Sequence, residues 1–313
     1  MPTDTPTPQP SPTATQKPKR TPQPLNTLPP DADTYEEWLP LFTYDPSVPF
    51  NVEEASVKTE ANGVTIHDIS FDAPGLGRIK AYLVVPPGEG PFAGVIFMHY
   101  LTSEGGNREE FFEEAVELAE FGVVSILPNG HFPWTQQPAT SKPEQDVNRA
   151  AAQVLEISRA LDLLLTQPGV DSNRIALVGH DYGGAWGSVL AGYDRRIKTA
   201  VLLAVPPRTS QWQLDYFPES VKGNPEKEDL YRTAMLAVEP ISYAGHFAPT
   251  SVFFQFADSD RYITLDAANE LFAAASEPKE MKIYSVDHDN LQTEPNAKRD
   301  RLDWLKAQLE LAR

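Results

Sequence analysis

Hydrophobic and polar positions alternate in two rhythms from about residue 60 onward. Residues 93–100 and 123–130 are continuous apolar runs, which are typical of strands buried on both faces of a parallel sheet. Residues 108–122 and 146–170 instead repeat apolar side chains every three or four positions, which predicts amphipathic helices. Because the two patterns keep alternating to the C-terminus, we expect a mainly parallel, doubly wound α/β sheet with helices on both faces.

The rest of the pattern completes this sheet. Further strands are predicted at 63–71, 78–85, 174–179, 198–205, 250–257 and 279–286, and further helices at 182–193, 265–275 and around Leu302, Leu305 and Leu309. The first two of these strands flank a short turn and are expected to pair antiparallel. Residues 206–248 break the rhythm with prolines and aromatic residues, which predicts a small insertion, or lid, before the penultimate strand. Residues 31–59 give no clear prediction.

The N-terminal segment 1–30 has a different composition, dominated by Pro and Thr with almost no apolar side chains. Such a segment predicts a disordered stalk, and residues 31–313 are expected to form the folded domain. Pro/Thr spacers of this kind resemble the stalks that follow the anchor of bacterial exported lipoproteins. The resemblance implies an exported or cell-surface protein whose lipid anchor is missing from this chain. A cytosolic protein with a flexible tail is the alternative.

Composition narrows the range of functions. The net charge of −18, with no basic cluster, argues against a nucleic-acid partner. No apolar run reaches the roughly 18 residues of a transmembrane segment. The chain has no cysteine, so it can form no disulfide, thiolate metal site or cysteine nucleophile. No spacing of His, Asp and Glu indicates a metal site and no glycine-rich loop indicates a phosphate, so we expect a small-molecule substrate and no cofactor.

One motif indicates chemistry. Gly179-His180-Asp181-Tyr182-Gly183 joins a predicted strand directly to a predicted helix, and small residues two places either side of Asp181 permit a sharp turn. This motif resembles the nucleophile elbow, G-x-nucleophile-x-G, of the α/β-hydrolase superfamily. With the order of elements, the resemblance extends from about residue 60 to the C-terminus, and it implies the α/β-hydrolase fold with Asp181 in the nucleophile position.

Different segments of the chain resemble two different subgroups of the superfamily. Residues 81–100 are most similar to dienelactone-hydrolase-type enzymes, whereas the elbow GHDYGG is similar to epoxide hydrolases and haloalkane dehalogenases, which use an aspartate there. The order nucleophile, acid, histidine implies Asp260 as the acid, with Asp258 as the fallback, and His288 as the histidine. Each of these follows a predicted strand at its carboxyl end.

The chemistry of an aspartate nucleophile follows from its pKa. A carboxyl with a reference pKa of about 3.9 is already ionised at neutral pH and needs no base to attack. Attack on carbon would give an ester, which a water activated by His288 would hydrolyse. The resemblance implies that the oxyanion hole is formed by the backbone N–H groups of Tyr182 and of Leu101 or Tyr100.

Aromatic residues of the insertion are expected to line an apolar substrate pocket. They are Trp212, Tyr216, Tyr231 and Tyr243. The substrate stays open between an epoxide, an alkyl halide and an ester or lactone. Two alternatives also remain at this point: a dienelactone-hydrolase-like esterase in which Asp181 assists a water, and a noncatalytic surface binding protein in which Asp181 only caps a helix.

Overall fold

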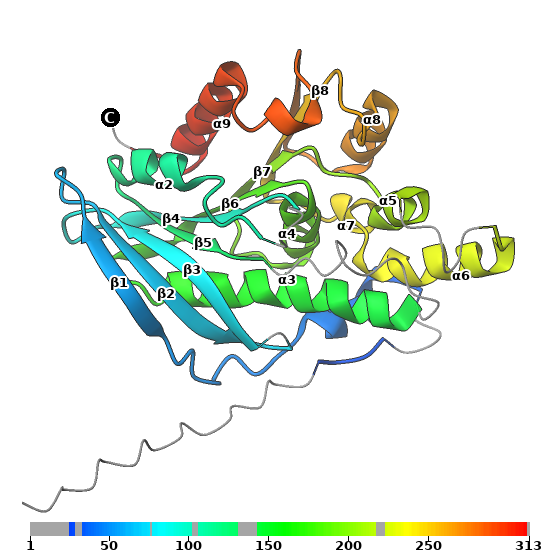
Figure 1. Ribbon diagram of the computed structural model, residues 1–313, viewed down its shortest axis with the longest axis horizontal. Coiled ribbons are helices and arrows are strands. Elements are labelled where there is room, and N and C mark those ends of the chain that lie inside the picture. Colours follow the sequence, from blue (N-terminus) through cyan, green and yellow to red (C-terminus); the bar gives the residue numbers. More distant parts are fainter. Residues whose placement is uncertain are drawn as a thin grey trace, which may run out of the picture.

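The sheet is the central feature of the computed structural model, which describes residues 25–28, 33–75, 77–101, 106–130, 143–216 and 223–311 (Figure 1). Its strands are β1 (Glu53–Thr59), β2 (Thr65–Ala73), β3 (Gly77–Val85), β4 (Phe92–Met98), β5 (Val123–Pro128), β6 (Val170–His180), β7 (Thr199–Leu203), β8 (Ser251–Ala257) and β9 (Lys279–Tyr284). Apart from 25–28, the predicted stalk lies outside the described residues.

The order of the strands is β1-β2-β3-β5-β4-β6-β7-β8-β9. The first four of these pair antiparallel, and all pairs from β5 to β9 are parallel. Every residue of β4, β5, β7 and β8 is buried, as expected for continuous apolar runs between two layers of helices. The prediction of a mainly parallel sheet is therefore confirmed.

Helices cover both faces of the sheet. They are α1 (Tyr35–Trp38), η1 (Leu39–Phe42), α2 (Phe112–Ala119), α3 (Pro143–Leu165), α4 (Tyr182–Tyr193), α5 (Thr209–Tyr216), α6 (Pro225–Met235), η3 (Leu236–Val238), α7 (Pro240–Ala244), α8 (Leu265–Ala274), η4 (His288–Asn290) and α9 (Pro295–Gln308). Helices α2 and α9 share one face, whereas α3, α4, α7 and α8 contact one another in turn on the other (Figure 1).

The predicted insertion between β7 and β8 holds α5, α6, η3 and α7. Glu239 fixes α5 in place. Its buried carboxylate accepts the backbone N–H groups of Thr209 and Ser210 at 2.5 and 2.9 Å, so it caps the first turn of α5 from outside the helix. Trp212 therefore lies on a helix whose first turn is fixed by Glu239.

The lead-in at 31–59 forms elements that the sequence did not predict. Strand β1 is exposed along its whole length at the edge of the sheet, so it carries no apolar pattern. Trp38, Leu41 and Phe42 are buried against the insertion side of the core, where the Phe42 ring lies edge-on to Tyr243. Helix α2 begins four residues later than the predicted 108–122, because residues before Phe112 form turns.

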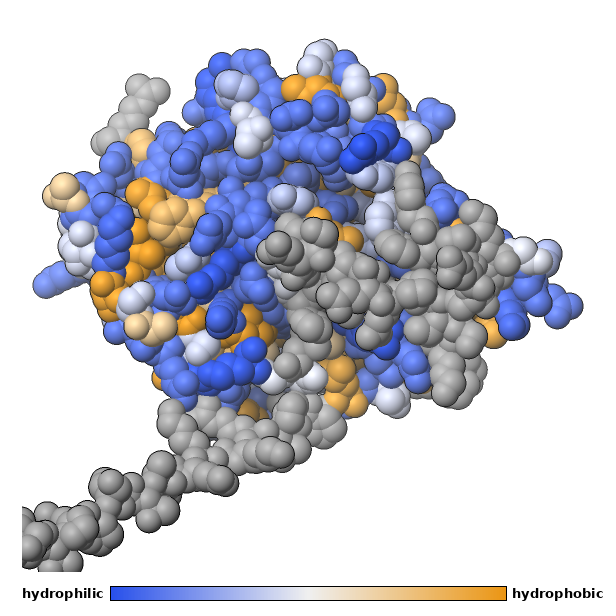
Figure 2. All heavy atoms as spheres, in the orientation of Figure 1, coloured by the Kyte–Doolittle hydropathy of each residue, from blue (hydrophilic) through white to orange (hydrophobic). Residues whose placement is uncertain are grey.

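The face in Figure 2 is largely hydrophilic, in keeping with the net charge of −18. Large exposed apolar side chains are scattered along the chain: Val48, Val52, Val57, Leu230, Leu236, Leu265 and Ile283. Among the described residues, we find no helix with the length and apolarity needed to cross a membrane.

Candidate active site

Asp181 occupies a strained turn between β6 and α4. Its φ of +51° and ψ of −115° lie in a region that side-chain-bearing residues rarely adopt, at a cost of about 1–3 kcal/mol. The turn is held by two backbone hydrogen bonds, from Asp181 N to Leu203 O at 2.9 Å and from Ala185 N to Asp181 O at 2.8 Å. The carboxylate accepts no hydrogen bond from the second or third residue of α4, where a capping side chain usually binds. Capping of that kind therefore does not account for an aspartate at this position.

Glycines let neighbouring backbones approach this turn. A Cβ added to Gly183 would lie 2.5 Å from His99 O and 2.6 Å from Met98 O, at the end of β4. A Cβ added to Gly179 would lie 2.6 Å from the Cα of Gly184. Since real Cβ atoms do not approach so closely, both positions need glycine. The close approach also brings the segment after β4 beside the Asp181 side chain.

Backbone donors surround the Asp181 carboxylate. Leu101 N donates to Asp181 Oδ2 at 3.2 Å, and the backbone N–H of Tyr182 is a second donor. Burial raises the pKa of Asp181, and nearby His288, His180 and the two N–H groups oppose that effect only in part, so the pKa stays above its ordinary value. The residue as a whole is nevertheless partly exposed.

His288 is paired with Asp260, which follows β8. The distance from His288 Nδ1 to Asp260 Oδ2 is 2.8 Å, and Asp260 Oδ1 accepts the N–H groups of Tyr262 and Ile263 at 2.8 and 2.9 Å. Burial raises the pKa of Asp260, but the hydrogen bond from His288 and the two N–H groups outweigh it and hold the pKa below its usual range. With Nδ1 bound to the acid, Nε2 of His288 is left for proton transfer.

The protonated form of His288 is favoured. Burial alone would lower the pKa of the imidazole, but the hydrogen bond to Asp260 and the negative charges of Asp181 and Asp260 outweigh it, so the pKa is raised. The fallback acid, Asp258, instead accepts the hydroxyl groups of Ser259 and Ser285 at 2.8 and 2.9 Å. The structure thus brings Asp260, and not Asp258, to the histidine.

A cavity of about 420 Å³ borders the site on the side of the insertion. Trp212 and Tyr262 are among its lining residues. The Tyr262 ring lies edge-on to His288 at 4.9 Å between centroids, and the Trp212 ring lies edge-on to Tyr182 at 5.6 Å. The predicted pocket residue Trp212 therefore lies between the cavity and the elbow.

The other predicted pocket residues lie elsewhere. Tyr243 is fully buried, donates its hydroxyl to Ala237 O at 2.8 Å and packs against Tyr35 and Phe42, which is a packing role. Tyr231 is also fully buried and is not among the residues that line the cavity. The side chain of Tyr216 lies outside the described residues. No group of three or more His, Asp or Glu side chains in the described ranges is placed to hold a metal ion.

Comparisons with known proteins address the fold. No family model matches the chain. Solved structures of acetyl xylan esterases superpose on it: one from Paenibacillus sp. R4 has a TM-score of 0.68 at 16% identity, covering 83% of this chain and 89% of that one. Another, acetyl xylan esterase 1 from a Thermoanaerobacterium species, has a TM-score of 0.69 at 16% identity, covering 90% and 96%. The chain has the α/β-hydrolase fold.

Among curated proteins, the chain is similar to acyl-coenzyme A thioesterase 3 of Mus musculus. The two are 25% identical over 163 residues, which is 50% of this chain and 34% of the thioesterase. The chain thus spans about a third of the length of this relative. In the α/β-hydrolase fold identified here, β6 and α4 form the elbow, and Asp260 and His288 follow β8 and β9.

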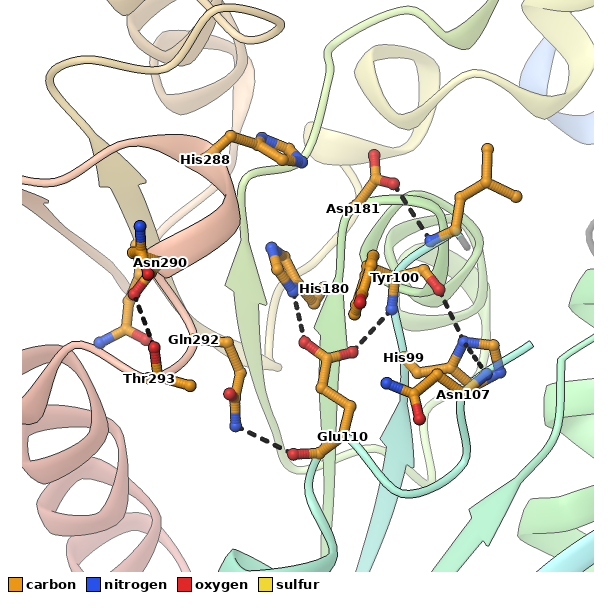
Figure 3. A network of polar contacts seen from close by, with 12 residues as sticks. His99, Tyr100, Asn107, Glu110, His180, Asp181, His288, Asn290, Gln292 and Thr293 are labelled. Carbon is orange, nitrogen blue, oxygen red and sulfur yellow. Dashed lines mark hydrogen bonds and ion pairs between the residues drawn. The ribbon is translucent and has the colours of Figure 1, made fainter. Parts of the chain in front are cut away.

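A buried pair beside the elbow, His180 and Glu110, was not predicted from the sequence or from the resemblance to the superfamily. His180 Nδ1 lies 2.5 Å from Glu110 Oε1, and both side chains are almost fully buried. Glu110 Oε2 accepts the N–H of Tyr100 at 2.7 Å (Figure 3). Tyr100 N is therefore occupied, and Leu101 is the residue of this segment that donates to Asp181. Glu110 stands beside Glu109, which is exposed, so the sequence carried no signal that separated the two.

Proposed function

We propose that this protein is a cofactor-independent hydrolase in which Asp181 is the nucleophile, His288 the base and Asp260 the acid that orients it. The site would act on a saturated carbon of a small apolar substrate, such as an epoxide or an alkyl halide. We infer a saturated carbon because the backbone donors of the predicted oxyanion hole bind the carboxylate of Asp181 itself.

The observation that carries this proposal is the hydrogen bond from Leu101 N to Asp181 Oδ2, with Tyr182 N as the second donor. In an acyl transfer by a serine, such donors must receive the oxygen of the substrate carbonyl. Here they already hold the carboxylate. The arrangement therefore stabilises charge on the carbonyl of Asp181 and favours a reaction in which that carbonyl is attacked.

In the first step, the free oxygen of the Asp181 carboxylate would attack the substrate carbon. A carbon–oxygen bond forms, and the bond to the epoxide oxygen or halogen breaks with its electron pair leaving on that atom. A halide departs as the anion, whereas the alkoxide of an opened epoxide takes a proton from solvent. The Leu101 N–H keeps Oδ2 in place, so that Oδ1 is the attacking atom. The product of this step is an ester between the substrate and Asp181.

In the second step, water would attack the carbonyl carbon of that ester. His288 Nε2 takes the proton of the water, and Asp260 stabilises the resulting imidazolium through Nδ1. Negative charge then develops on Oδ2, next to the N–H of Leu101. Collapse of this intermediate breaks the ester bond and releases the alcohol with the proton from His288. The second proton of the water passes from the new carboxyl to solvent, which restores the carboxylate with one oxygen from water.

A second candidate is hydrolysis of an ester or thioester by a water that His288 activates and Asp181 orients. It is supported by the names of the similar proteins, which are acetyl xylan esterases and an acyl-coenzyme A thioesterase. In this scheme the water attacks the substrate directly, and no bond forms to Asp181. The two candidates therefore differ in one covalent species.

The experiment is trapping of that species with His288→Gln. The variant is incubated with a panel of epoxides, alkyl halides and esters, and its intact mass is followed against the parent protein and His67→Gln. His67 is a suitable control because it pairs with Glu54 on β2 and β1, among strands remote from the elbow.

We expect an added mass of one substrate on Asp181 in His288→Gln only, with a hydrolysis step slowed about 10²–10⁴-fold. Turnover of esters by the parent without any adduct in the variant would replace the proposal with direct water attack. Binding of probes without turnover in the parent would replace it with a noncatalytic binding protein.

A further inference from the structure

Three segments of the site meet at Glu110. Oε2 of its carboxylate accepts the N–H of Tyr100, which precedes the donor Leu101, and Oε1 lies 2.5 Å from Nδ1 of His180, which precedes Asp181. Its backbone oxygen accepts the side chain of Gln292 at 3.1 Å, in the segment that follows His288. Figure 3 shows Glu110 between the ring of His180 and the backbone of Tyr100. One residue thus contacts three of the four segments that supply the proposed chemistry, all but the segment of Asp260.

The pair between Glu110 and His180 is buried. The exposed fractions of the two side chains are 4% and 3%. A carboxylate removed from water is stable only when it is paired and hydrogen-bonded, and the contact of 2.5 Å is shorter than the roughly 2.7–2.9 Å of most charge-assisted N–H···O bonds. Both oxygens of Glu110 are bonded, because Nδ1–H of His180 donates to Oε1 and the N–H of Tyr100 donates to Oε2.

His180 faces the reacting groups. Its ring centroid lies 5.7 Å from that of His288, and its Nε2 is buried with no hydrogen-bond partner among the described residues. The titratable groups around the ring are Glu110 before α2, Asp181 on the elbow, His288 on η4 and His99 and Tyr100 after β4. The ring that Glu110 fixes therefore lies among the proposed reacting groups.

We propose that Glu110 is a positioning residue that fixes the His180 ring behind Asp181 and holds the Leu101 N–H against the nucleophile. The inference rests on the proposed function, because its consequence is kinetic. Both steps require this alignment, since the Leu101 N–H holds Oδ2 while Oδ1 attacks and faces the negative charge that later develops on Oδ2.

The proposal is tested by the rate of adduct formation in Glu110→Gln with a substrate that labels Asp181 in the parent. Glu109→Gln is the matched control, because it removes the same charge from the adjacent, exposed glutamate. Loss of donor alignment predicts a rate about 10²-fold lower in Glu110→Gln with little change in KM.

Thermal unfolding of each variant separates this effect from loss of fold. A rate in Glu110→Gln within twofold of the parent would overturn the inference, while an unlabelled Asp181 in the parent would overturn only the proposed function.

Discussion

Two carboxylates of this protein differ in how completely they are paired. Glu114 on α2 meets Arg301 on α9, a fully buried guanidinium that also donates to Gln255 and Gln292, so all charged groups there are paired. Asp181, which follows β6, lies on a strained backbone, has a raised pKa and remains partly exposed. The first arrangement links α2 to α9, whereas the second carries the proposed nucleophile.

The difference indicates that the residues that stabilise this fold and those proposed for its reaction are different ones. A closed ion pair loses much when one partner is removed, because the other charge is left buried. A strained, partly satisfied carboxylate contributes nothing comparable to folding, so its loss affects only the reaction. Variants at the two places should therefore show opposite phenotypes.

The largest effect is expected from Asp181→Ala. Without the nucleophile, turnover should fall by about 10⁴-fold or more, as removal of one member of a catalytic triad commonly does. The free energy of unfolding should stay equal or rise at neutral pH, since a carboxyl whose pKa is raised in the folded state disfavours folding when ionised. Steady-state kinetics and urea unfolding check the two parts. A clear loss of stability would contradict the comparison.

Glu114→Ala should do the reverse. Leaving Arg301 buried without its carboxylate predicts a loss of about 3–5 kcal/mol in the free energy of unfolding. Activity per folded molecule should change little. Urea unfolding against Glu113→Ala, which removes an exposed carboxylate from the same turn, measures the difference. Equal stabilities of the two variants would show that the ion pair does not hold α2 to α9.

Gly183→Ala tests the close approach at the elbow. The added Cβ would meet His99 O at 2.5 Å, so the backbone must shift, at a cost of about 1–3 kcal/mol. The segment carrying Leu101 should move with it, and adduct formation should slow. Gly245→Ala is the control, because the nearest atom to its added Cβ is 3.7 Å away. Adduct formation as fast as in the control would argue against a fixed donor at Leu101.

The smallest change comes from pH alone. Hydrolysis of the adduct needs neutral His288, and the pKa of this residue is raised above its ordinary value. Below that pKa, hydrolysis should slow by about tenfold for each pH unit, while Asp181 still forms adduct until the pH falls through its own pKa. Rapid-quench mass spectrometry should therefore show more adduct as the pH is lowered. A hydrolysis rate independent of pH in this range would exclude His288 as the base.

Much of the fold could be predicted from the sequence, because its signals are local. The apolar runs in β4 to β8 mark strands that are buried between two layers of helices. The two glycines around Asp181 mark places where neighbouring backbones come close to the turn. Strand β1 and the segment with Trp38 were missed for physical reasons: the strand is an exposed edge, and the segment is buried by a few side chains only.

The site was predictable where chain order carries the information. Asp260 and His288 each follow a strand, and the structure brings them within 2.8 Å. Glu110 was not predictable, because it lies 70 positions from His180 and looks like its exposed neighbours in a helix-like pattern. Tyr243 was expected in the pocket, but the lead-in that gave no pattern packs against it.

The central claim is that a bond forms between substrate and Asp181. The most direct measurement is one turnover in heavy-oxygen water with the enzyme in excess, followed by mass spectrometry of the peptide that contains Asp181. The account predicts heavy oxygen in the Asp181 carboxylate, because the water attacks its carbonyl carbon. Heavy oxygen found only in the product, with an unlabelled Asp181 peptide, would contradict it.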